Sequence, residues 1–80
     1  MTTQVTEVTR GTVGVEVEMT SDTNAASVLV SKSAVYVLVR RGNGVSKVGR
    51  RFADAASAIA AYKSESVREM IATACEIAAA

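Results

Sequence analysis

The chain has 80 residues, of which 49% are hydrophobic, and it carries a formal net charge of +1, one cysteine and no histidine. A chain of this length is expected to fold as one domain, residues 1–80, with a small core. Cys75 has no second cysteine to pair with, and without histidine the commonest zinc ligand and general base are missing. We therefore expect a binding protein rather than an enzyme, with no cofactor and no metal site.

Charged residues are segregated along the chain. Residues 1–30 hold one basic and four acidic residues, a net charge of −3, and residues 53–80 hold two basic and four acidic residues, a net charge of −2. Residues 31–52 hold six basic residues and no acid. Such asymmetry is typical of a chain that presents a charged surface to a partner.

No segment of the sequence is typical of membrane insertion or export. None reaches the roughly 20 apolar residues that a membrane span requires. The residues after Met1 lack the basic start and apolar run of a secretion signal. We expect a cytoplasmic protein with no membrane partner.

Alternating apolar residues predict a half-buried strand over residues 12–20. One face carries Val13, Val15, Val17 and Met19. The opposite face is polar and includes Glu16 and Glu18. Residues 21–24 predict a turn, because short polar side chains hydrogen-bond to the nearby backbone.

Valine-rich segments predict further strands over residues 27–31 and 34–41. The second segment is apolar on both faces, which is typical of a central strand covered on both sides. Residues 4–9 are a weaker strand candidate, because Val5 and Val8 would fall on opposite faces of a regular strand.

A hairpin turn is predicted at Asn43-Gly44, because a two-residue type I′ turn needs positive φ at both positions. The resulting register pairs Val39 with Val48 and Val35 with Phe52. A slip by one residue, which would pair Leu38 with Val48, is the alternative that the pattern leaves open.

Alanine and other helix-forming residues follow the last predicted strand. Asp54 is placed to cap a first helix that buries Ile59 and Tyr62. The segment Ser66-Val67-Arg68-Glu69 predicts a capping box at the start of a closing helix. Residues 63–65 are either a break between two helices or a bend within one.

Apolar residues at helical spacing predict the buried face of the closing helix. They are Val67, Met70, Ile71, Ala74, Ile77 and Ala78. Cys75 lies among them and is expected to be a small buried hydrophobe rather than a reactive thiol.

Together these elements predict an α+β fold. We expect an antiparallel sheet of four to five strands within residues 1–52, and one or two Ala-rich helices within residues 53–80 packed on one face. Alanine side chains remove little apolar area from water, so the stability is expected to be marginal, in a monomer or a homodimer.

Five basic residues flank the predicted hairpin turn and form the first candidate site. They are Arg40, Arg41, Lys47, Arg50 and Arg51. On a β-ribbon they would neutralise phosphates of a duplex or a structured RNA, with Tyr36 and Phe52 near enough to stack on bases. The alternative is that paired arginines keep an edge of the sheet soluble.

Residues 34–78 contain, in order, a strand, the Asn43-Gly44 turn, the segment Val48-Gly49-Arg50-Arg51-Phe52, and Asp54 with the two helices. In this order of elements they resemble small phage-encoded type I anti-CRISPR proteins. It implies an antiparallel sheet with helices on one face. It also implies an inhibitor that binds the backbone subunits of a Cascade surveillance complex in a bacterial host cell and keeps target DNA from hybridising. The partner-facing tyrosine and acid of that family have no counterparts here, so no site residue is carried over.

Acidic residues near the first strands form the second candidate site, because a surface that normally holds DNA is basic and attracts acids. They are Glu7, Glu16, Glu18 and Asp22. The alternative is an ordinary solvated strand face. The two candidate sites support two hypotheses, a protein-binding inhibitor and a nucleic-acid-binding protein, which place the binding energy on opposite charges.

Overall fold

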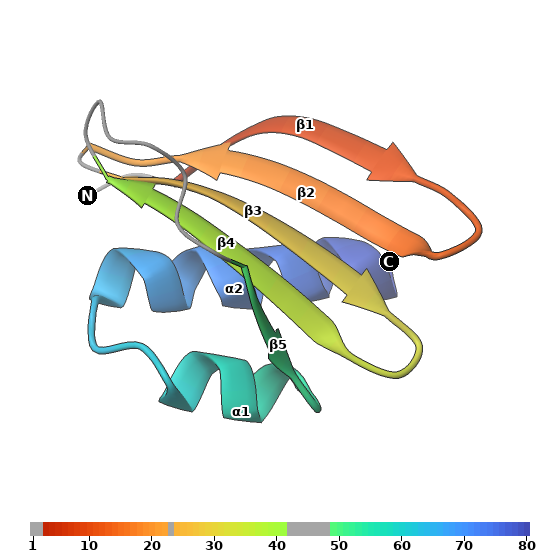
Figure 1. Ribbon diagram of the computed structural model, residues 1–80. Coiled ribbons are helices and arrows are strands. Elements are labelled where there is room, and N and C mark those ends of the chain that lie inside the picture. Colours follow the sequence, from red (N-terminus) through yellow and green to blue (C-terminus); the bar gives the residue numbers. More distant parts are fainter. Residues whose placement is uncertain (1–2, 23, 42–48) are drawn as a thin grey trace.

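Five antiparallel strands form one sheet, and two helices cover one of its faces (Figure 1). The computed structural model describes residues 3–22, 24–41 and 49–80. The elements in chain order are β1 (Gln4–Arg10), β2 (Gly14–Thr20), β3 (Asn24–Ser31), β4 (Val35–Arg41), β5 (Arg50–Phe52), α1 (Ala55–Ala60) and α2 (Glu65–Ala79). The strand order in space is β1-β2-β3-β4-β5, so each strand pairs with its neighbours in sequence. The predicted α+β fold is confirmed.

Strand β2 confirms the predicted alternation over most of its length. Val17 and Met19 are buried and face the helices, whereas Glu16 and Glu18 between them are exposed. Val13 was expected on the buried face, but it precedes the strand and is 69% exposed. The predicted turn closes where the Ser21 amide donates to the Asn24 carbonyl at 2.8 Å.

Strand β1 differs from the expectation that its two valines point to opposite faces. Val5 pairs with Met19 and Val8 pairs with Val17, and both partners face the helices. The register shifts between Val5 and Glu7, which is a β-bulge: one extra residue in β1 reverses the alternation. Both valines therefore lie on the helix side, each about 40% exposed, because α2 packs over β2 and β3.

The core lies between the sheet and α2. The largest fully buried side chains come from both layers: Val17, Met19, Val28 and Val37 from the strands, and Val67, Met70 and Ile71 from the helix. The predicted buried face of the closing helix is thus confirmed up to Ala74, while Ile77 and Ala78 near its end are half-buried.

The helical region contains a true break, so the chain forms two helices rather than one bent helix. Asp54 caps α1 as predicted, accepting the Ser57 amide on Oδ1 at 2.8 Å. This hydrogen bond lowers the pKa of the Asp54 carboxyl.

The predicted capping box is wrong, because the N-cap of α2 is Ser64. The Val67 amide approaches Ser64 Oγ at 3.5 Å. Ser66 lies inside the first turn, where it is buried and accepts from Asn24 Nδ2 at 2.9 Å. Its hydroxyl therefore ties α2 to β3 instead of capping the helix.

Strand β4 was expected to be covered on both faces, and it is covered on only one. Val35, Val37 and Val39 are buried against the helices, whereas Tyr36 on the other face is 39% exposed. Val35 pairs with Phe52, which confirms the predicted register and rules out the slip. The predicted Asn43-Gly44 turn and the predicted pair of Val39 with Val48 lie outside the described residues.

Candidate functional site: the open sheet face

The sheet face opposite the helices, called the open face here, carries part of each candidate group of charges. Strand alternation and register assign its side chains. From β1 to β5 they include Glu7 and Thr9, Glu16 and Glu18, Ser27 and Leu29, Tyr36, Leu38 and Arg40, and Arg51. Across the strands they grade from acidic through neutral to basic.

The acidic side of the open face, Glu7, Glu16 and Glu18, lies on β1 and β2. Glu7 and Glu18 are direct cross-strand partners, an arrangement that is unfavourable for stability because like charges oppose each other. Thr9 Oγ1 donates to Glu7 Oε2 at 3.4 Å, and Ser27 Oγ donates to Glu16 Oε2 at 3.1 Å. Three of the four predicted acidic residues thus come together.

Asp22, the fourth predicted acid, does not share this surface. It is exposed in the turn between β2 and β3. It therefore adds negative charge near one end of these strands without lying on the open face.

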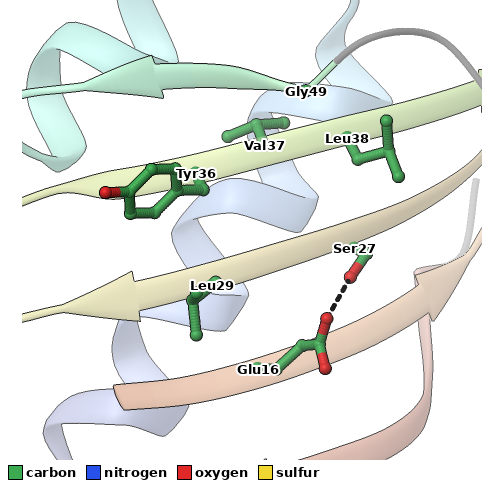
Figure 2. A pocket seen from close by; sticks show the side chains of 7 residues that line it. All are labelled: Glu16, Ser27, Leu29, Tyr36, Val37, Leu38 and Gly49. Atoms are coloured by element: carbon green, nitrogen blue, oxygen red, sulfur yellow. Dashed lines mark hydrogen bonds between the residues drawn. The ribbon is translucent and has the colours of Figure 1, made fainter. Parts of the chain in front are cut away.

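The centre of the open face is apolar. Leu29 pairs with Tyr36 across β3 and β4, and Leu38 lies two residues further along β4. Figure 2 shows these side chains around a shallow depression of about 250 Å³, with the Glu16–Ser27 hydrogen bond along one side. Sequence reasoning missed this centre. Its signal is the apolar outer positions of β4, a pattern that also predicts a second covering layer.

The predicted basic site is divided between the two faces of the sheet. Arg51 pairs with Tyr36 and is exposed on the open face, and Arg40 is exposed on the same face further along β4. Arg50 pairs with the buried Val37 and so points to the helix side. Lys47 and the side chain of Arg41 lie outside the described residues.

Arg50 has a structural environment of its own. Its guanidinium lies over the rings of Phe52, at 5.0 Å, and Tyr62, at 5.5 Å. The two rings meet edge to face with centroids 5.9 Å apart. Phe52 is half-buried in this cluster, on the helix side, so it does not share the open face with Tyr36.

Among the described residues, no group of three or more acids or cysteines is placed so that it could hold a metal ion. Cys75 is half-buried against the core, and this burial raises the pKa of its thiol, which disfavours the nucleophilic thiolate. No helix in the described part of the chain is both long and apolar enough to cross a membrane.

The fold and the open face together define a small α+β domain in which helices cover one sheet face and no described helix or strand covers the other. Comparison with protein-family models, with curated proteins and with solved structures finds no match for this chain.

Proposed function

We propose that this protein is a non-catalytic inhibitor of a type I CRISPR surveillance complex. In this proposal the acidic side of the open face binds the backbone subunits of Cascade and blocks the binding of target DNA. The observation that carries the proposal is the gathering of Glu7, Glu16 and Glu18 on one uncovered sheet face. The particular target comes from the resemblance of residues 34–78 to type I anti-CRISPR proteins.

Electrostatics supports an acidic surface in this role. A groove that binds DNA must be basic, so it also attracts a protein that presents carboxylates on a flat, pre-formed face. Glu16 and Glu18 lie two residues apart on β2, about 6.6 Å along the strand. Because β2 is held between β1 and β3, these carboxylates are presented on a rigid strand rather than on a loop.

A second candidate function is nucleic-acid binding through the basic side of the open face, defined as Arg40 and Arg51. Its supporting observation is that Arg51 lies opposite the exposed ring of Tyr36, so a phosphate contact and a stacking surface are adjacent. The two arginines are four residues apart in register, about 13 Å along the strands. A gel shift with duplex DNA and RNA at low salt tests this function, and no retardation would exclude it.

The inhibitor proposal is tested with purified Cascade complexes of several type I subtypes and labelled target DNA. The acidic-side variant, Glu16→Lys/Glu18→Lys, is compared with a helix-surface control, Glu69→Lys/Glu76→Lys. Both variants raise the net charge by four, and all four positions are exposed.

We expect the native protein to block DNA binding by at least one subtype. The acidic-side variant should lose at least about tenfold in inhibitory potency, about 1.4 kcal/mol, while the control keeps it. Absence of inhibition in every subtype, or an equal loss in both variants, would contradict the proposal.

A further inference from the structure

We infer that the open face also binds a second copy of this chain, in a symmetric homodimer in which two sheets pack face to face. The inference rests on the order of charges across the sheet and does not depend on the proposed CRISPR target. It begins from the five strands in their spatial order. The acids lie on β1 and β2, the outward side chains of β3 are uncharged, and the arginines lie on β4 and β5.

This order of charges is self-complementary for one of the two simple orientations of the dimer. A two-fold axis parallel to the strands reverses the strand order, so β1 and β2 of each copy lie over β5 and β4 of the other. The strands that carry the acids then lie over the strands that carry the arginines twice. Arg51 lies over Thr9 of the other copy, next to Glu7 on the same strand, and Arg40 lies over Thr20, next to Glu18. An in-plane axis perpendicular to the strands would instead place β1 over β1 and acids over acids. Charge complementarity therefore selects the first orientation, in which the two sheets are aligned, as in β-sandwiches.

The register determines what meets at the centre of such a dimer. Glu16, Leu29, Tyr36 and Arg51 form one row across four strands. Because β3 is the middle strand, the axis passes over it, and Leu29 of each copy meets Leu29 of the other. In the same row Tyr36 of each copy lies over Glu16 of the other copy. The tyrosine hydroxyl can there donate a hydrogen bond to the glutamate carboxylate. An apolar centre with a charged rim is typical of protein interfaces.

The available area supports a reversible dimer. Strands about 4.8 Å apart and about 23 Å long give the five-stranded face a footprint of about 500 Å² per copy. Two such footprints approach the smallest area that specific interfaces bury, about 1,200 Å² in total. The flat footprint does not include the extra surface area that protruding side chains add. We therefore expect a dissociation constant in the micromolar range. Since the dimer covers Glu16 and Glu18, binding to another partner through the same face would require dissociation.

Sedimentation equilibrium over a range of protein concentrations tests the inference. The native chain should be a dimer at high concentration, and the helix-surface control should behave in the same way. The acidic-side variant and its counterpart, the basic-side variant Arg40→Glu/Arg51→Glu, should each be monomeric, because each leaves a face with one dominant sign of charge. An equimolar mixture of the two variants should restore a dimer, now of unlike chains.

A further variant keeps the test decisive if either double substitution disturbs the fold. Leu29→Asp places two carboxylates against each other on the axis and should also give a monomer, with circular dichroism confirming the fold.

A native chain that stays monomeric at about 500 µM, a concentration far above a micromolar dissociation constant, would overturn the inference. So would charge variants that remain dimeric alone, or a mixture that fails to associate. A monomeric native chain that still inhibits Cascade would refute the dimer only, and a dimer without inhibition would refute the proposed function only.

Discussion

The two faces of the sheet are built from alternate residues of the same strands, yet they differ in almost every property. On the helix side Val17, Val28 and Val37 are at most 1% exposed and form the core with α2. On the open face their neighbours include Glu16, Leu29 and Tyr36, which contribute charge and exposed apolar surface. The difference indicates that one face provides the stability of the domain and that the other is available for binding. Substitutions on the two faces should therefore have separable effects.

The largest expected effect is on the covered face. Met70→Ala removes a fully buried side chain from α2 and should lower the free energy of unfolding by about 2–5 kcal/mol. Leu29→Ala on the open face should lower it by less than about 1 kcal/mol. Urea denaturation measures both changes. Equal losses at the two positions would contradict the division between the faces.

Substitution of Gly14 should be an exception to the rule that changes on the open face have little effect on stability. A Cβ at this position would collide with the backbone carbonyl of Val30 on the neighbouring strand, so the strands must move apart to accept it. We expect Gly14→Ala to destabilise the domain by about 1–3 kcal/mol. Gly11→Ala is the matched control, because no heavy atom lies within 4 Å of its added Cβ. Thermal unfolding of the two variants makes the comparison.

Arg50 and Arg51 give the same contrast with adjacent residues. Arg50→Ala removes the guanidinium from the Phe52 and Tyr62 rings and should lower the free energy of unfolding by about 0.5–1 kcal/mol. Arg51→Ala should leave stability unchanged and weaken self-association instead. Chemical denaturation and sedimentation of both variants measure these effects. If Arg50→Ala weakened self-association and Arg51→Ala did not, the assignment of Arg50 to stability and Arg51 to self-association would be wrong.

The smallest expected effect depends on pH and lies at the start of α1. The Asp54 carboxylate accepts the Ser57 amide, which lowers its pKa below the ordinary value of 3.8. Its stabilising contribution is therefore present above about pH 4 and is lost as the pH falls through the lowered folded-state pKa. The difference in unfolding midpoint between the native chain and Asp54→Ala should shrink from pH 7 to pH 2–3. A difference that is constant over this range would exclude the cap as its source.

Local patterns in the sequence predicted most of the fold. The alternation over β2 and the Asp54 cap each depend on residues close to one another in the chain. The Val35–Phe52 register was predictable because the position of Asn43-Gly44 in the sequence fixes which residues of two adjacent strands pair. The bulge in β1 could not be predicted, because it is set by pairing with β2. The true cap of α2 was missed because Ser64 and Ser66 are both suitable residues, and contact of Ser66 with Asn24 decides between them.

The candidate site was predicted less completely. The shared face of Glu16 and Glu18 could be predicted, because alternation within a single strand places residues two positions apart on the same side of the sheet. The arginines were grouped by proximity in sequence, but alternation sends Arg50 and Arg51 to opposite faces. The apolar centre at Leu29 and Tyr36 was missed because an apolar outer face of a strand is compatible with either a covering layer or an interface.

The central claim is that the open face is the surface through which this protein associates with a second copy of itself. Amide NMR shifts of ¹⁵N-labelled protein, followed on dilution from about 1 mM to about 10 µM, test it most directly because this range spans a micromolar dissociation constant. The account predicts concentration-dependent shifts at outward-facing residues of β2, β3 and β4, with Leu29 and Tyr36 among the largest. Shifts confined to α2, or spectra that do not change with concentration, would contradict it.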